Sequence, residues 1–229
     1  MDQSSFAPLT TRLAAYLNCT QDVACQQILQ GLAETGQPLA LMDVASRLQI
    51  SQERLAAHLT HVPDTEFDHE GKIVGWGITL VPTPHQFWVE GRALFTWCAF
   101  DTVLFPPLLA LEAQVQSACA ASGQSIRFRV SPGGIEELTP TTSVLSLLLP
   151  ARRCDCVRGT FCQQSLFFEN EQAASAFLST HPGALILSIE EAAYVGRMVA
   201  SRRFAEEQQG RVGHADHMML QDGDGRDRS

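Results

Sequence analysis

Two spacings of apolar residues divide this sequence, and the change between them lies near Pro82 and Pro84. Before these prolines, apolar side chains recur every three or four positions, which is the period of an amphipathic helix. After them, short apolar runs separated by glycine and proline are typical of strands. The pattern therefore predicts an α+β fold, in which a helical N-terminal part precedes a second part of mixed α and β structure.

The N-terminal part predicts helices over residues 6–34, 41–48 and 52–59. Ser51 stands directly before the last of these helices, where its hydroxyl can cap the first turn. Residues 67–80 predict a hairpin with Gly71 at its turn, which is the position of the wing in a winged helix. We therefore expect a winged-helix-like helical domain over residues 1–83, ending near Thr83.

A helix-turn-helix with a wing can bind DNA through its second helix, so the charge of that helix is informative. Residues 52–59 offer Arg54 for phosphate, and Glu53 stands next to it. The whole chain of 229 residues carries a net charge of −9. Binding to phosphate needs clustered Lys and Arg. We therefore predict no nucleic-acid partner, and a helical unit that packs on the rest of the chain.

The sequence also predicts a cytoplasmic protein. No apolar run approaches the roughly 18 to 20 residues needed to cross a bilayer, and the first residues lack a basic stretch followed by an apolar segment. The seven cysteines are an odd number without the dense framework of a small secreted domain, which favours reduced thiols. We expect no membrane partner. Residues 205–229 are too polar to be buried and predict a disordered tail.

Residues 84–204 predict a mixed α/β domain with strands at 86–91, 113–120, 125–130, 143–149 and 166–168. Buried or closing helices are expected at 94–111, 171–179 and 188–203. Pro106 and Pro107 lack amide donors and clash with the preceding turn, so we expect the first of these helices to kink or end there. This break would lie at the mouth of a site near Phe105.

The strongest candidate for chemistry is Cys98 with Asp101, in the segment Phe95-Thr-Trp-Cys-Ala-Phe-Asp-Thr102. A spacing of three in an expected helix places both side chains on one face, where they can act on one substrate. Cys162 is a second candidate thiol that the fold must bring to them. Two thiols can hold a soft metal while the acid moves a proton. The alternative for any single cysteine is a packing role in the core.

The other cysteines and the histidines give weaker signals. Cys119 lies in an alternating strand pattern, which favours a structural role. Cys154 and Cys156 follow two arginines, whose charge favours thiolate, and form either a loop that hands on metal or an exposed pair without a function. No CxxC pair is present and no histidine falls at structural-zinc spacing, so we expect no four-ligand zinc site.

From about Leu39 to Met198, the chain resembles the organomercurial lyases (alkylmercury lyases) of bacterial mercury resistance. The matching motifs occur in the family order and lie at residues 65–71, 75–80, 94–106, 119–123, 130–132, 161–162 and 167–168. Many family members carry a second cysteine where this chain has Gln163. The Cys154 and Cys156 pair and the long tail are further departures from the family pattern.

The resemblance implies a winged-helix-like domain that does not read DNA, joined to a mixed α/β catalytic domain that comprises residues 84–204 here. It implies that Cys98 and Cys162 bind mercury, that Asp101 is the catalytic acid, and that Cys119 has no direct chemical role. The expected reaction is protonolysis of the carbon–mercury bond of alkyl and aryl mercurials, giving a hydrocarbon and Hg(II). No intrinsic cofactor is expected, but a small thiol in excess or a protein dithiol is needed to remove Hg(II). Mercuric reductase is the implied partner.

Two other classes of function use the same residues. A mercury- or thiol-responsive regulator would combine the cysteines with the helix-turn-helix, and it would bind DNA. A metal-carrying protein would bind mercury without turnover. Release of hydrocarbon from an organomercurial separates the lyase from both.

Overall fold

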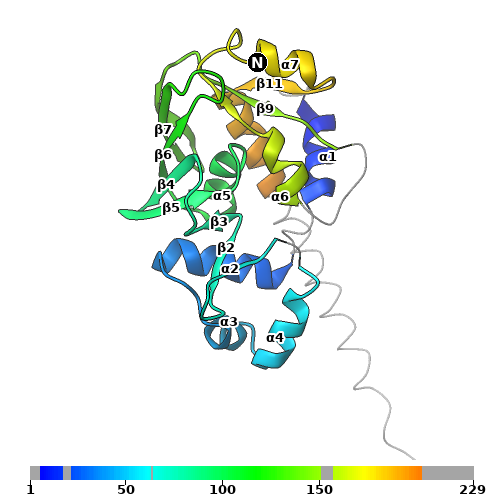
Figure 1. Ribbon diagram of the computed structural model, residues 1–229, viewed down its shortest axis with the longest axis vertical. Helices are drawn as coiled ribbons and strands as arrows, with labels where there is room; N and C mark the ends of the chain where they lie inside the picture. Colours follow the sequence, from blue (N-terminus) through cyan, green and yellow to red (C-terminus); the bar gives the residue numbers. More distant parts are fainter. Residues whose placement is uncertain (1–5, 18–21, 63, 151–156, 203–229) are drawn as a thin grey trace, which may run out of the picture.

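The computed structural model describes residues 6–17, 22–62, 64–150 and 157–202. Its main feature is an eight-stranded sheet with the strand order β1-β2-β3-β5-β4-β6-β7-β8, in which every pair of neighbours is antiparallel. A smaller sheet has the order β10-β9-β11 and is also antiparallel. Helices α2 to α4 lie at one end of the molecule, away from the small sheet (Figure 1). The mixed α+β class is confirmed.

The helical part contains α2 (Val23–Thr35), α3 (Leu41–Arg47) and α4 (Gln52–Leu59), followed by strands β1 (Glu66–Phe67) and β2 (Ile73–Trp76). The hydroxyl of Ser51 accepts a hydrogen bond from the amide of Arg54 at 3.2 Å, as the predicted cap requires. β1 and β2 form the predicted hairpin, in which Gly71 has a φ of 76°. A glycine adopts this left-handed conformation without steric cost.

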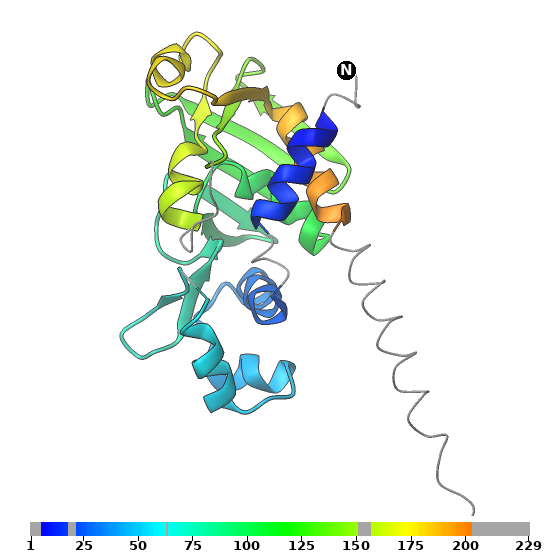
Figure 2. The same cartoon turned by 90° about the vertical axis from the view of Figure 1, so that its right-hand side faces the viewer.

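The first predicted helix is divided, and its first portion packs away from the rest of the helical part. Helix α1 (Ala7–Tyr16) lies beside the helix over residues 189–202 in both views (Figures 1 and 2). The Tyr16 hydroxyl lies 2.9 Å from that of Thr160, and the Tyr16 ring packs on Phe161. α1 therefore helps to hold the segment that carries Cys162.

The rest of the large sheet is formed by β3 (Ile78–Thr79), β4 (His85–Val89), β5 (Arg92–Thr96), β6 (Ala113–Ala118), β7 (Ser125–Ser131) and the edge strand β8 (Gly134–Thr139). Burial alternates along β4, β6 and β7. Along β7, Ile126, Phe128 and Val130 are buried while the residues between them are exposed. One face of the sheet therefore covers the core, and the opposite face carries polar side chains.

The prediction of one helix over residues 94–111 is wrong in its first half. Residues 92–96 form strand β5, which pairs with both β4 and β3, and helix α5 (Asp101–Leu109) begins only after a turn. Cys98 lies in that turn. Phe95 and its neighbours can form a strand or a helix equally well by hydrophobicity, and strand pairing decides between the two.

The helix was expected to kink or end at Pro106 and Pro107, and it does not end there, because both prolines lie inside α5. The helix ends instead at Ala110, which adopts a left-handed conformation with a φ of 52°. Most of α5 is buried, so tertiary packing compensates for the two missing amide donors. A side chain at Gly196 would lie 2.6 Å from the Val103 carbonyl, so the helix over 189–202 approaches the backbone of α5 as only glycine permits.

The remaining elements are α6 (Val157–Thr160), the 3₁₀ turn η3 (Cys162–Gln164), α7 (Ser175–Thr180), and strands β9 (Val144–Leu147), β10 (Phe167–Phe168) and β11 (Leu185–Ser188). Cys162 thus begins a 3₁₀ turn and not a strand. Strands β8 and β11 were not predicted. The helix expected over 171–179 is shorter, and Asn170 accepts a hydrogen bond from the amide of Ala173 in the turn before it.

Several predictions fall on residues whose structure is not described. The tail over 205–229 and the Cys154 and Cys156 pair lie outside the described residues. The domain boundary near residue 83 stays a prediction. Among the described residues, no helix is both long and apolar enough to span a membrane.

Candidate active site

Cys98 is held in the turn between β5 and α5 by hydroxyl groups on both sides of it. The Thr96 hydroxyl donates to the Cys98 carbonyl at 3.0 Å, and the Thr102 hydroxyl donates to the Ala99 carbonyl at 2.7 Å. Both threonines are fully buried. Buried hydrogen bonds of this kind leave the turn little freedom, so the position of the Cys98 thiol is well defined.

Ser165 joins this turn to the segment that carries Cys162. Its hydroxyl accepts a hydrogen bond from the Phe100 amide at 3.0 Å, and its carbonyl accepts one from the Ala99 amide at 3.1 Å. The Ser165 amide in turn donates to the Cys162 carbonyl at 3.2 Å. Ser165 is completely buried. Two segments more than sixty residues apart in the sequence are thereby fixed against each other.

The three predicted residues meet at one point. The thiol sulfurs of Cys98 and Cys162 and a carboxylate oxygen of Asp101 all lie within 4.8 Å of one another. Their exposed fractions are 0%, 5% and 7%. Asp101 also accepts a hydrogen bond from the Cys98 amide at 3.1 Å. The two residues are close because Asp101, the first residue of α5, folds back onto the preceding turn, and not because they share a helix face.

Burial changes the acid–base properties of all three groups. Burial raises the pKa of Asp101 to about 7, although hydrogen bonds from the thiol and amide of Cys98 oppose this change. Burial also raises the pKa of Cys98, while a hydrogen bond with the Cys162 thiol favours the Cys98 thiolate. The pKa of Cys162 is raised well above its ordinary value by its hydrogen bond with Cys98 and by burial. Of the two thiols, Cys98 is therefore the one placed to ionise first.

A small cavity of about 30 Å³ opens onto Asp101 and Cys162. Its other lining residues are mostly apolar: Leu17, Asp64, Trp76, Gly77, Trp97, Leu104, Phe105 and Val157. Phe105 lies at the site as predicted, although the helix does not end there. Cys98 itself does not line this cavity. An apolar enclosure of this size excludes bulk water and leaves space for one small group beside the acid and the second thiol.

Four residues near the site were not identified from the sequence as site residues. They are Ser165 and three polar residues close to Trp97, namely Asp64, Glu66 and Arg158. The Trp97 indole donates to Glu66 at 3.1 Å, and the Arg158 guanidinium pairs with the same carboxylate. The amide of Arg158 donates to Asp64 at 3.1 Å. Glu66 lies in the motif at 65–71, and Asp64 directly precedes it. This motif was the one feature of the sequence that pointed to these two residues. The contacts of Ser165 and Arg158 depend on the fold.

Cys119 lies outside this group of thiols and acid. Burial raises its pKa, but hydrogen bonds from the Ser122 hydroxyl and from the amides of Ser122, Glu169 and Ala121 outweigh burial and lower the pKa overall. A role in the chemistry would require the Cys119 sulfur to lie close to those of Cys98 and Cys162. Among the described residues, Cys119 is not part of the group of possible metal ligands that these two cysteines form with Asp101.

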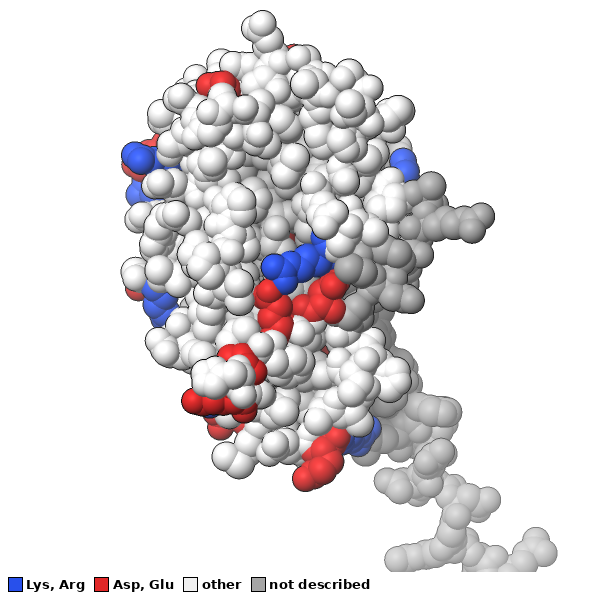
Figure 3. Space-filling view, viewed as in Figure 1, with Lys and Arg blue, Asp and Glu red and all other residues white. Residues whose placement is uncertain are grey.

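The face of the molecule shown in Figure 3 gives little sign of a nucleic-acid site. In the face shown in Figure 3, acidic side chains are prominent over the helical end of the molecule and basic side chains are scattered. Arg47 of α3 pairs with Glu34 at 3.0 Å.

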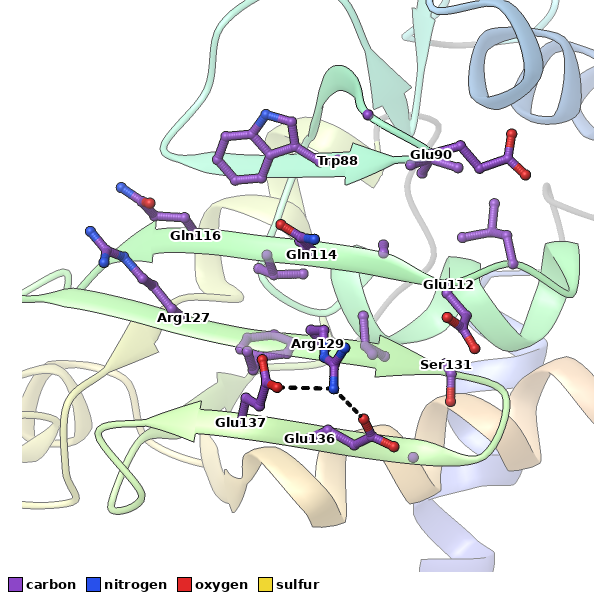
Figure 4. A pocket seen from close by; sticks show the side chains of 18 of the residues that line it. Trp88, Glu90, Glu112, Gln114, Gln116, Arg127, Arg129, Ser131, Glu136 and Glu137 are labelled. Carbon is purple, nitrogen blue, oxygen red and sulfur yellow. Dashed lines mark hydrogen bonds and ion pairs between the residues drawn. The ribbon is translucent and has the colours of Figure 1, made fainter.

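A larger hollow of about 1030 Å³ lies on the polar face of the sheet (Figure 4). Its charged groups include Arg129, which pairs with Glu136 and Glu137 at 2.8 and 3.0 Å.

Known proteins resemble this chain both in sequence and in fold. A family model described as alkylmercury lyase matches residues 78–201, which include all three residues of the site. The alkylmercury lyase of Bacillus cereus is 37% identical over 175 residues, covering 76% of this chain and 79% of that protein. The alkylmercury lyase of Pseudomonas putida is 39% identical over 167 residues, covering 73% and 78%. The crystal structure of the mercury-bound form of MerB2 matches with a TM-score of 0.69 at 22% identity, covering 84% of this chain and 99% of that one, which shows a shared fold.

Proposed function

The chain belongs to the alkylmercury lyase family, and from this premise we propose that Cys98, Asp101 and Cys162 cleave the carbon–mercury bond of organomercurials. The observation that carries the proposal is the buried triangle of two sulfurs and one carboxylate within 4.8 Å. Thiolate sulfur is the soft ligand that proteins offer to a soft metal such as mercury. A carboxyl group with a pKa near 7 can both accept and donate a proton at neutral pH.

The first step is exchange of thiolates on mercury. The substrate enters as R–Hg–SR′, in which R′S⁻ is a small thiolate. Cys98 transfers its proton to Asp101, and its sulfur bonds to mercury as the Hg–SR′ bond breaks. The hydrogen bond from Cys162 stabilises the Cys98 thiolate during this step.

The second step joins Cys162 to the metal and cleaves the carbon–mercury bond. As the Cys162 sulfur bonds to mercury, its proton leaves on the displaced R′S⁻. Two sulfurs now push electron density onto mercury and weaken the bond to carbon. Asp101 delivers its proton to that carbon, so R–H departs and Hg(II) remains held by two sulfurs. Proton transfer from a positioned acid contributes about 10²- to 10⁴-fold to such a rate.

No intrinsic cofactor enters this scheme, because mercury is part of the substrate and the side chains supply both protons. Two buried thiolates hold Hg(II) tightly, so release requires competing thiols. We propose that a small thiol in excess or a protein dithiol removes the metal, and that mercuric reductase is the acceptor. Thiols with this role must remain reduced, which favours a cytoplasmic location.

We also propose that α2 to α4 with the β1–β2 hairpin form a winged-helix-like unit that has lost DNA binding, within an N-terminal domain that ends near residue 83. The order of three helices and a hairpin supports this proposal. The backbone bridge between Leu39 and Ile73 joins the helices to the hairpin. A regulator is the less favoured alternative, because the family match is to an enzyme and α4 offers only Arg54 for phosphate contact.

Detection of the hydrocarbon product tests the proposed function directly. Methylmercury or phenylmercury is incubated with the reduced protein and excess thiol, and methane or benzene is measured by gas chromatography. We expect hydrocarbon from the wild-type protein and none above background from Cys98→Ala. Absence of hydrocarbon from folded, reduced wild-type protein would refute the proposal and favour metal binding or sensing.

A further inference from the structure

One wall of the site cavity is held closed by a polar cluster on its outer side. The cluster consists of Glu66, Trp97 and Arg158, and we refer to it as the clamp. Trp97 and Val157, the neighbour of Arg158, line the cavity. Glu66 lies in strand β1, Trp97 follows β5, and Arg158 lies in α6, so the clamp joins three separate segments.

Each member of the clamp contacts both of the others. One carboxylate oxygen of Glu66 accepts the Trp97 indole N–H at 3.1 Å, and the other pairs with the Arg158 guanidinium. The guanidinium carbon lies 5.3 Å from the centre of the Trp97 ring, which is a cation–π distance. Glu66 is only 14% exposed, whereas Arg158 is 39% exposed. The charged member of the clamp that stacks on Trp97 is thus partly open to solvent, whereas its carboxylate partner is mostly buried.

The Glu66 carboxylate lies directly against the backbone of Gly75. A side chain added at Gly75 would come within 1.9 Å of a carboxylate oxygen of Glu66, so this glycine makes the space that the carboxylate occupies. The Arg158 amide donates to Asp64, two residues before Glu66. Both the side chain and the main chain of Arg158 are therefore fixed to the segment over 64–66.

The cavity behind the clamp is small compared with the groups it must accept. Its volume of about 30 Å³ is enough for one or two water molecules or a group as small as methyl. A cavity that binds an aromatic ring such as benzene has a volume of about 150 Å³. The fixed inner walls, Leu104 and Phe105, belong to the buried helix α5. Leu17, Trp76 and Gly77 are buried as well, whereas Trp97 and Val157 are only partly buried. The side of Trp97 and Val157 is therefore the one from which space for a larger group can come.

On the basis of the proposed function, we propose that the clamp determines which organic groups the enzyme accepts. With the Glu66–Arg158 pair closed, the site takes methyl and other small alkyl groups. Aryl groups enter only when Arg158 leaves Glu66 and Trp97 moves outward. The clamp residues are specificity determinants, and they take no part in the transfer of protons or the binding of mercury.

The test is a comparison of kcat/KM for phenylmercury and methylmercury in wild type, Arg158→Met and Glu66→Gln. Arg158→Met keeps an apolar chain over Trp97 but loses the ion pair, and Glu66→Gln keeps an acceptor for the indole. We expect each to raise the phenyl-to-methyl ratio by roughly 3- to 10-fold, the scale of a partly exposed ion pair with a cation–π contact. The double variant is expected to show the same ratio as each single variant, because both break one pair. Arg158→Lys is expected to recover part of the wild-type ratio.

Arg129→Met is the matched control, because it removes an arginine paired with two glutamates on the polar sheet face. The phenyl-to-methyl ratio of kcat/KM in this variant is expected to equal that of wild type. An unchanged ratio in Arg158→Met and Glu66→Gln would overturn the proposal, and Glu66→Gln alone decides if Arg158→Met does not fold. If wild type releases hydrocarbon from both mercurials but the ratio never moves, only the clamp is refuted. Failure of wild type to release any hydrocarbon refutes the proposed function and the clamp with it.

Discussion

Two hollows in the described part of the chain can be compared, and the smaller one lies at the residues proposed to carry the chemistry. The cavity beside Asp101 and Cys162 holds about 30 Å³, whereas the hollow on the polar face of the sheet holds about 1030 Å³ (Figure 4). The small cavity removes two thiols and a carboxyl group from water. The large hollow leaves Arg129 and its glutamate partners half or more exposed. Volume alone would select the polar sheet face and not the buried group of two thiols and a carboxylate.

Desolvation explains the difference between the two regions. A carboxyl group loses the stabilisation of water when it is buried, so its pKa rises toward the pH at which it must work. Asp101 follows this rule, with a pKa of about 7. On the sheet face, water and salt screen the ion pairs, which contribute little to stability or reactivity. The comparison predicts that substitutions at the small cavity have large effects on activity and stability, and that substitutions on the polar face of the sheet have almost none.

The largest effect is expected from removal of the second sulfur. Cys162→Ala should still exchange one thiolate onto mercury through Cys98, but it cannot weaken the bond to carbon with a second sulfur. Turnover of methylmercury should fall by at least about 10³-fold, the scale seen when a residue that acts as part of a unit is lost. Methane release under single-turnover conditions measures this fall. Full activity in Cys162→Ala would rule out the mechanism with two thiolates.

Asp101→Asn is expected to separate binding from cleavage. Both sulfurs remain, so Hg(II) should bind with a stoichiometry of one, measured by mass spectrometry under native conditions. The proton donor is lost, so hydrocarbon release should slow by about 10²- to 10⁴-fold. Wild-type rates of release in this variant would remove Asp101 from the role of acid.

Asp101 should also give the stability of the metal-free protein a definite dependence on pH. Its pKa rises from an ordinary 3.8 to about 7 on folding, so the folded state prefers the protonated acid. The stability that this preference provides is fully present below about pH 4 and is lost as pH rises through about 7. The loss is on the order of a few kcal/mol, at about 1.4 kcal/mol for each pKa unit.

Urea denaturation of reduced protein between pH 4.5 and 8 measures this dependence. Asp101→Asn is the control, because it lacks the titrating group. Its stability relative to wild type should increase with pH up to about 7 and then level off. A difference that does not change over this range would show that Asp101 is not desolvated in the folded protein.

The sequence indicated which residues meet at the small cavity better than it predicted their local structure. Cys98, Asp101 and Cys162 were identified by residue type and by the motifs around them. The helix assumed for Cys98 was wrong, because residues 92–96 pair with β3 and β4 as a strand. Apolar runs such as Ala93 to Phe95 carry no clear period, so only their partners can decide the structure.

The elements that were missed depend on contacts between distant residues. Ser165 bonds to Phe100 across 65 positions, and no local pattern marks it. Strand β8 lies at the edge of the sheet, where its burial does not alternate and where Glu137 adopts a left-handed φ of 56° beside an irregular register. Edge strands and bulges of this kind lack the alternation that identifies central strands such as β7.

Ser165→Ala tests the contact that holds the two halves of the small cavity together. The change leaves the buried Phe100 amide without a partner, which costs about 1–3 kcal/mol of the free energy of unfolding. Chemical denaturation measures this loss. Ser143→Ala is a suitable comparison, because its buried hydroxyl donates only within its own turn, to the Pro140 carbonyl. Hydrocarbon release should fall in Ser165→Ala and not in Ser143→Ala, since only the first loosens Cys98 against Cys162.

The smallest effect is expected on the polar face of the sheet. Arg129→Met breaks two ion pairs at 2.8 and 3.0 Å, but all three side chains are at least half exposed. Such pairs contribute less than about 1 kcal/mol, so the free energy of unfolding should change by about 0.5 kcal/mol or less. Hydrocarbon release should stay within about twofold of wild type, because screened charges outside the small cavity do not affect its buried groups. A larger fall in activity would show that the large hollow takes part in the reaction, and the contrast between the two regions would no longer hold.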